Sequence, residues 1–206
     1  MAIVVYLETE DGNFKKSALE VSSYGRKLAD ETKTNLYGIA FNSLDPDKIR
    51  KYGVEKLINI KTDHVFDARV FADLLCKNFK ELGGTIFITG SSADSRFIFP
   101  VVSILLDASY ATNVVDFPSG ISPLVLKRSA FTNKGFVFTE LKTKYKIIGI
   151  LNNSYGIFES ERKLEVKEYM AESQDSNLQV ESIKEDEEKI SIADAEIVVS
   201  GGRGLK

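Results

Sequence analysis

The residues that most directly suggest chemistry lie near the end of the chain, at Gly201, Gly202, Arg203 and Gly204. Because glycine has no side chain, a glycine-rich turn lets the backbone come close to a phosphate or a flavin. Arg203 would add a fixed positive charge and a fork of hydrogen-bond donors. The same residues also suit a flexible tail, since glycine-rich stretches commonly mark loops. The glycine pattern alone leaves both interpretations open.

A second pattern that suggests ligand binding is the turn Gly90-Ser91-Ser92, which follows an apolar run at 85–89. We expect a helix directly after this turn. Backbone amides at the start of a helix hold anions well, so the turn is a candidate phosphate site. Serine is also a preferred helix cap in any protein. A tight turn with a serine cap is therefore the simpler interpretation.

The remaining reactive side chains do not form a catalytic set. His64 is the only histidine and is expected at the surface, near the start of a helix. Cys76 is the only cysteine, so an internal disulfide or a cysteine-rich metal site is excluded, and we expect a buried thiol. Asp67 and Asp73 share a predicted helix but not a face of it. The sequence therefore predicts no catalytic residue and no metal site.

Strands alternate with helices over roughly the first 110 residues. Short apolar runs predict strands at 2–7, 36–41, 56–60 and 85–89. Helical spacing of apolar residues predicts helices at 15–31, 64–81 and 94–107, with a short one at 45–51. Such alternation is typical of parallel strands joined by right-handed crossovers. The fold class is therefore α/β, a Rossmann-like and mostly parallel sheet with helices on both faces.

Capping residues predict where these helices begin and end. Thr62 or Asp63 would cap the helix at 64–81, and Gly53 would end the short helix before it. Pro100 falls inside the predicted helix 94–107. Proline lacks the backbone N–H, so it should lie in the first turn of that helix or kink it.

The pattern changes after residue 110. Strands are predicted at 112–117, 123–131, 135–141 and 146–151, with a hairpin turn at 132–135. The sheet should thus acquire an antiparallel hairpin extension, and residues 1–160 form one amino-terminal α/β domain. Residues 161–194 are polar and contain a charged run at 184–188, so we expect a linker or edge segment. An apolar strand at 195–200 then leads into the glycine turn.

Composition narrows the functional classes. The chain has 27 basic and 30 acidic residues, a net charge of −3, so no basic field favours nucleic acid. No apolar run is long enough to span or insert into a membrane, and the first residues do not resemble a leader peptide. We expect a cytoplasmic protein.

The last ten residues, 197–206, read Ile-Val-Val-Ser-Gly-Gly-Arg-Gly-Leu-Lys. They resemble the sequence that opens the FAD-binding domain of electron transfer flavoprotein alpha subunits. Upstream segments resemble the same family in order and spacing: the acidic turn Glu8–Gly12, the Thr89–Ser92 turn, the Pro100 helix with Leu105-Leu106-Asp107, and the strand 112–116. The resemblance covers nearly the whole chain and implies that residues 195–206 are the truncated start of the FAD-binding domain.

This resemblance implies a heterodimeric electron carrier rather than an enzyme. The alpha subunit of the family pairs with a beta subunit and binds FAD. The flavin takes electrons from acyl-CoA dehydrogenases of fatty acid β-oxidation and from other dehydrogenases, and passes them to a membrane-bound quinone oxidoreductase. Arg203 matches the family arginine beside the flavin ring, where a cation raises the reduction potential. We expect these 206 residues alone to bind FAD weakly or not at all.

The chain departs from the family pattern at three places. Val101 follows Pro100 where the family has arginine, residues 127–133 lack the usual Arg-Pro and Tyr-Ala-Gly-Asn, and residues 152–155 replace an Arg-Gly-Thr-x-Phe segment. These changes bear on the subunit interface and on any flavin contact from the first domain. The alternative function is a stand-alone adenine-nucleotide-binding α/β module similar to universal stress proteins, in which the Gly90-Ser91-Ser92 turn holds the phosphate.

Overall fold

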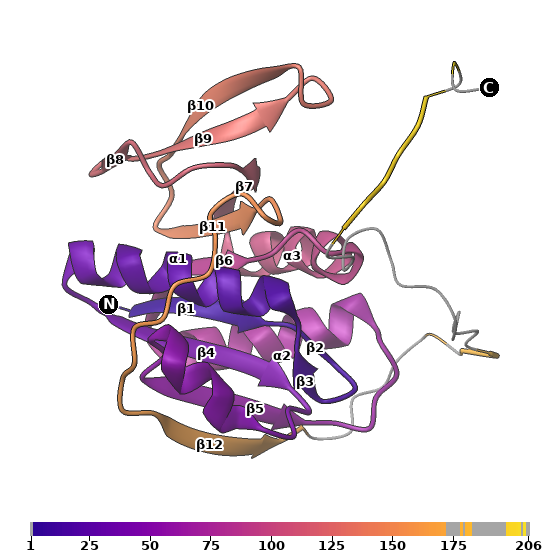
Figure 1. The fold of residues 1–206 in the computed structure, drawn as a ribbon. Helices are drawn as coiled ribbons and strands as arrows, with labels where there is room; N and C mark the ends of the chain where they lie inside the picture. The colour runs from indigo at the N-terminus through magenta and orange to yellow at the C-terminus, as the bar shows by residue number, and fades with distance from the viewer. Residues whose placement is uncertain (1, 172–177, 179, 183–196, 203, 205–206) are drawn as a thin grey trace. The chain divides into compact units, whose positions relative to one another are not determined.

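The computed structural model describes residues 2–171, 178, 180–182, 197–202 and 204 (Figure 1). The chain forms two compact units, Met1–Ser176 and Asn177–Lys206. The first unit extends past the boundary expected at residue 160, because a strand at Glu165–Met170 belongs to its sheet.

One mixed sheet organises the first unit. Its strands are β1 (Ala2–Leu7), β4 (Asn35–Phe41), β5 (Lys56–Lys61), β6 (Gly84–Thr89), β7 (Ala108–Val114), β8 (Gly120–Ile121), β9 (Leu124–Ala130), β10 (Gly135–Leu141), β11 (Tyr145–Ile150) and β12 (Glu165–Met170). The order is β10-β9-β7-β11-β6-β1-β4-β5-β12, and β8 pairs with β9. In the part of this order that runs β7-β11-β6-β1-β4-β5-β12, all neighbouring strands are parallel. The strand β9 runs antiparallel to β7, β8 and β10. The predicted parallel sheet with an antiparallel hairpin extension is confirmed.

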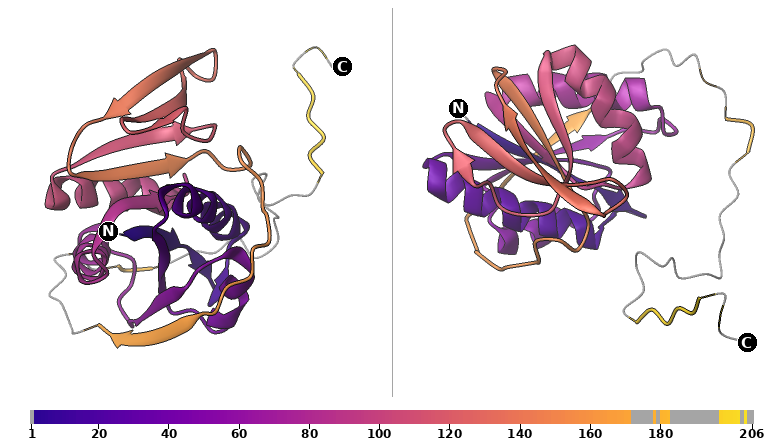
Figure 2. Two further views of the ribbon diagram at one scale, coloured as in Figure 1. Left: turned by 90° about the vertical axis from the view of Figure 1, so that its left-hand side faces the viewer. Right: turned by 90° about the horizontal axis from the view of Figure 1, so that it is seen from above.

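Helices cover both faces of this sheet, as predicted (Figure 2). Helix α1 (Lys16–Thr32) and the 3₁₀ helix η1 (Pro46–Tyr52) lie on one face. Helices α2 (Ala68–Glu81) and α3 (Ala93–Leu106) lie on the other. A two-stranded ribbon, β2 (Thr9–Glu10) with β3 (Asn13–Phe14), links β1 to α1.

The central strand β1 is buried on both sides and divides the core into two clusters. Successive side chains of a strand point to opposite faces. Ile3 and Val5 therefore join the cluster under α1, and Val4 and Tyr6 join the cluster under α2 and α3. An unbroken apolar run is the expected signature of such a strand.

The second cluster is rich in aromatic rings. Phe79 of α2 is fully buried and stacks on Phe87 of β6, with ring centroids 4.9 Å apart and planes 9° apart. Phe87 meets Phe99 of α3 edge to face at 5.1 Å. These rings join both helices to the sheet.

Two details of the helix ends differ from the prediction. Helix α2 begins at Ala68 rather than 64, so a cap at Thr62 or Asp63 is wrong. Asp67 caps the helix instead, and its carboxylate accepts from the backbone N–H of Arg69 at 2.8 Å. Phe66 and Phe71 pack across this end with ring centroids 5.5 Å apart, a hydrophobic staple that fixes the later start.

The other predicted ends agree better with the structure. Gly53 ends η1 in the left-handed region, with φ of 87°, as expected for a glycine at this position. Pro100 lies in the interior of α3 rather than in its first turn, and the helix is assigned continuously from 93 to 106.

The predicted strand at 195–200 is not seen at the residues that are described. Residues 197–200 have no regular structure, and Ile197 and Val199 are 83% and 93% exposed. A strand needs a hydrogen-bonded neighbour, and none of the described residues supplies one here. Residues 195–196 lie outside the described part of the chain.

None of the helices in the described part of the chain has the length and apolar character that crossing a bilayer requires.

Truncating Phe79 to alanine should destabilise the fold severely. The change removes a fully buried ring that joins α2 to β6, so the free energy of unfolding should fall by about 3–5 kcal/mol. Urea unfolding followed by circular dichroism measures this loss. Phe131→Ala is the matched control, because its ring is 78% exposed and its removal should leave the midpoint nearly unchanged. Equal losses in the two variants would contradict the assignment of the core.

Candidate functional site

The predicted glycine turn is not part of an assembled pocket among the described residues. Gly201, Gly202 and Gly204 belong to the second unit and are exposed. A side chain placed on Gly202 or Gly204 would meet open space. Arg203 lies outside the described residues. Local packing therefore gives no reason for glycine at 202 and 204.

The sheet has a topological switch point, and the strand ends there, called the crevice below, are where ligands commonly bind in this kind of fold. Successive strands run one way from β1 through β4 to β5, and α2 then returns the chain to β6 on the other side of β1. In open parallel sheets, the carboxyl ends of strands at such a switch point form the usual binding crevice. Here those ends carry Glu8 after β1 and the Gly90-Ser91-Ser92 turn after β6.

Carboxylates dominate this crevice. Glu8 is 6% exposed, and its Oε1 lies 2.9 Å from Lys15 Nζ. Glu10 lies 3.7 Å from the same amino group. Burial and the negative charge of Glu8 raise the pKa of Asp94, at the start of α3. Burial, Glu8 and Asp94 together raise the pKa of the Tyr6 hydroxyl beneath them.

The Ser91 amide and both serine hydroxyls of this turn already have partners within the domain. Ser92 caps α3 by accepting from the backbone N–H of Ser95 at 3.1 Å. The backbone N–H of Ser91 donates to Asn152 Oδ1 at 3.3 Å, and the Ser91 hydroxyl accepts from the Asn152 N–H at 3.3 Å. The structure thus supports the serine-cap interpretation. The carboxylates at the crevice would repel a phosphate group.

A different surface with binding character is the hairpin face, defined here as the exposed apolar residues of the β9–β10 hairpin. Phe131 is 78% exposed, Phe136 and Phe138 are each 62% exposed, and Val137 is 41% exposed. Among the described residues, β10 pairs only with β9, and it is one end of the sheet order. An exposed, apolar edge strand is a template for pairing with another chain.

The part of the chain that carries the hairpin face is basic, although the whole chain is acidic. Residues 108–150 contain six basic and two acidic residues, whereas the whole chain has 27 and 30. Lys127 Nζ lies 4.6 Å above the centre of the Phe136 ring, a cation–π contact. The surface would therefore suit an acidic partner better than a second copy of itself.

The sequence analysis did not identify this surface. A signal was available in the run Phe136-Val137-Phe138. A half-buried antiparallel strand alternates apolar and polar residues. Three apolar residues in succession indicate that both faces of β10 carry apolar side chains, and all three are exposed.

The other predicted residues behave largely as expected. Cys76 is buried, and burial raises the pKa of its thiol to about 11, which suits a structural role. His64 is half-buried and precedes α2 by several residues rather than starting it. Within residues 2–171 and the other described positions, no cluster of histidine, cysteine, aspartate or glutamate could hold a metal.

These features define an α/β domain with an unpaired apolar edge and an acidic crevice. The chain belongs to the electron transfer flavoprotein domain family, whose model matches residues 3–174. Members of this family are electron carriers. No curated protein shows significant sequence similarity to the chain.

One similar solved structure is a universal stress protein from Archaeoglobus fulgidus. It is 14% identical, with a TM-score of 0.33, over 48% of this chain and 86% of that protein. A likeness this low carries no argument about function.

Replacing Lys15 with methionine should destabilise the domain at neutral pH. Burial alone would lower the pKa of Lys15, but the hydrogen bond and charge of Glu8 outweigh it, and the pKa is raised. Without Lys15, Glu8 is left buried and unpaired, at a cost of about 1–3 kcal/mol.

The sign of the pH dependence follows from the raised pKa. At pH values below the ordinary lysine pKa of 10.5, the Lys15–Glu8 pair makes its full contribution to the free energy of unfolding. This contribution is lost as the pH rises through the higher folded value, so the gap between the wild type and Lys15→Met should close above that pH. Thermal unfolding across pH 7–11 measures it. In the control Lys48→Met, an exposed pair with Asp45 is broken, and little change is expected. A gap that widens in alkali would refute the assignment.

Proposed function

We propose that this chain is the amino-terminal part of the alpha subunit of an electron transfer flavoprotein, and that its first unit is the docking domain for a beta subunit. The observation that carries the proposal is the hairpin face, an unpaired apolar strand edge on a domain of this family. The acidic, internally paired crevice supports a structural role for this unit rather than nucleotide binding.

The proposed docking combines strand addition with aromatic packing. A partner strand would pair with the free edge of β10, and its side chains would cover Phe136 and Phe138. Buried aromatic side chains commonly supply most of the binding energy at protein interfaces. The surrounding lysines favour a partner surface with carboxylates at its rim.

The proposed role of residues 195–206 is to open the FAD-binding domain. No neighbour among the described residues requires glycine at 202 or 204, so we attribute these glycines, with Gly201, to the close approach of a flavin. Arg203 would stabilise the anionic reduced flavin. The carrier would be cytoplasmic, taking electrons from acyl-CoA and other dehydrogenases and passing them to a quinone oxidoreductase.

Replacing Phe136 and Phe138 together with serine should abolish subunit docking without unfolding the domain. Both rings are mostly exposed, so the melting temperature should hardly change. Co-expression with the cognate beta subunit, followed by affinity capture and size-exclusion chromatography, measures docking. We expect the wild-type chain to retain the beta subunit and the double variant to lose it.

The matched control is Leu44→Ser, because Leu44 is 75% exposed and follows β4, on the opposite side of β1 in the sheet order from the hairpin. It should co-purify like the wild type. Retention of the beta subunit by the double variant, or its loss in the control, would reject the hairpin face as the docking surface.

The 206 residues alone should not form a stoichiometric FAD complex. The glycine turn and Arg203 would contact only part of the flavin, and a small ligand needs most of its surface buried. Titrating FAD and following its fluorescence and the visible spectrum of the dialysed protein measures this. A yellow, stoichiometric preparation would show that the flavin site is complete within these residues.

A further inference from the structure

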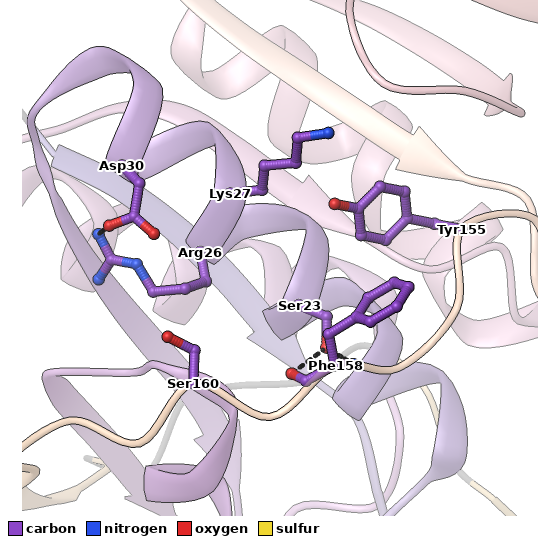
Figure 3. Close-up of a pocket in the computed structure, with 7 residues that line it drawn as sticks. All are labelled: Ser23, Arg26, Lys27, Asp30, Tyr155, Phe158 and Ser160. Carbon is purple, nitrogen blue, oxygen red and sulfur yellow. Dashed lines mark hydrogen bonds and ion pairs between the residues drawn. The ribbon is translucent and has the colours of Figure 1, made fainter.

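A hollow of about 360 Å³ lies between α1 and the segment 151–164, which we call the strap (Figure 3). The strap leads from β11, inside the sheet, to β12 at its far edge and crosses α1 on the way. Helix α1 lines the hollow with Ser23, Arg26, Lys27 and Asp30. The strap lines it with Tyr155, Phe158 and Ser160.

The strap wall of the hollow is held in place by buried polar groups. The carboxylate of Glu20, itself 5% exposed, accepts from the backbone N–H of Asn153, Tyr155 and Gly156 at 2.8, 2.8 and 3.1 Å. The hydroxyl of Ser23 accepts from the N–H of Phe158 at 2.9 Å. Because these bonds fix the backbone, the hollow is preformed and does not require a rearrangement to open.

One side of the hollow is aromatic. The Phe158 side chain is 60% exposed and meets Tyr155 edge to face, with centroids 5.8 Å apart. Tyr155 is supported from behind by Tyr24, at 5.0 Å. An uncovered ring on a fixed backbone offers apolar surface to a flat ligand, and stacking adds to the burial of that surface.

The other side of the hollow is charged, and most of its charges are already paired. Arg26 is 6% exposed; it contacts Asp30 at 2.8 Å and Glu55 at 3.4 Å. Asp30 also contacts Arg162 at 3.7 Å. The buried Nε–H of Arg26 has no acceptor among the described residues.

Lys27 is the exception. Its amino group lies 4.3 Å from the centre of the Phe117 ring and has no carboxylate within ion-pair distance among the described residues. Glu31, one turn further along α1, contributes after burial to the raised pKa of Tyr155. Among the cations that line the hollow, Lys27 is therefore the one available to an anionic group.

We propose that this hollow binds a small flat aromatic molecule that carries one anionic group. The ring packs against Phe158 and Tyr155, and the anion lies beside the Lys27 amino group. The volume is at the low end of the roughly 300–1,000 Å³ typical of ligand sites, which suits a single ring. This site is independent of the hairpin face and of the proposed subunit docking.

The test is a titration of the 206-residue chain followed by ¹H–¹⁵N NMR. The probe is phenyl phosphate, with benzyl alcohol as the ring without the charge and inorganic phosphate as the charge without the ring. We expect saturable shifts at the amides of Lys27, Phe158 and Ser160 with phenyl phosphate, and binding at least tenfold weaker with either half alone. Shifts confined to Gly90 and Ser91 would place the ligand at the crevice and overturn the proposal.

Variants test whether binding depends on this hollow or on exposed lysines and aromatic rings in general. Lys27→Gln and Phe158→Ala should each weaken phenyl phosphate binding severalfold. Lys80→Gln, an exposed lysine on α2, and Phe131→Ala, an exposed ring on the hairpin, should not. All four side chains are exposed, so circular dichroism should show intact folds. The proposal would be overturned if the variants and their controls had equal effects. It would also be overturned if benzyl alcohol bound equally tightly, or if no saturable shifts were seen.

Discussion

The burial of β1 on both faces is the constraint from which the rest of the fold follows. A strand that is apolar on both sides needs helices on both sides. The chain meets this need by placing α1 on one face, and α2 and α3 on the other. This change of face between the first and the later crossovers creates the switch point beside β1. The position of the crevice is thus a consequence of core packing, whatever residues line it.

The residues at that crevice differ from those that would bind a phosphate in a fold of this kind. The switch point is where sheets of this kind commonly receive a phosphate. Here Glu8 is buried against Lys15, and Asp94 is close enough for the charge of Glu8 to raise its pKa. The Ser91 amide of the neighbouring turn is bonded to Asn152, and the Ser92 hydroxyl caps α3. The surfaces of the first unit that we propose for binding are instead the hairpin face and the hollow between α1 and the strap.

The sequence predicted the regular elements well because their signals are local. The apolar run 2–7, the helical spacing within 16–32 and the glycine at 53 each reflect interactions of neighbouring residues. The later start of α2 was missed because it depends on a contact between Phe66 and Phe71 that competes with two earlier capping residues. The edge strand β12 was also hard to place, since its sequence is mostly polar and its partner β5 lies about a hundred residues earlier.

The candidate sites were less predictable than the fold. Glu20 and the strap are more than 130 residues apart, and no local pattern in Glu20 indicates that its carboxylate binds three backbone amides. The exposure of Phe136 and Phe138 follows from the place of β10 at the end of the sheet, which only the strand order reveals. The glycine turn at 201–204, in contrast, is conspicuous in the sequence and has no structural partner among the described residues.

The strand order also places the two edge strands of the sheet, β10 and β12, far apart. The hairpin lies at one end of the order, and β12 lies at the other. Eight steps of about 4.8 Å between neighbouring strands put roughly 38 Å of sheet between them. A protein bound along β10 would therefore leave the β12 rim of the sheet uncovered.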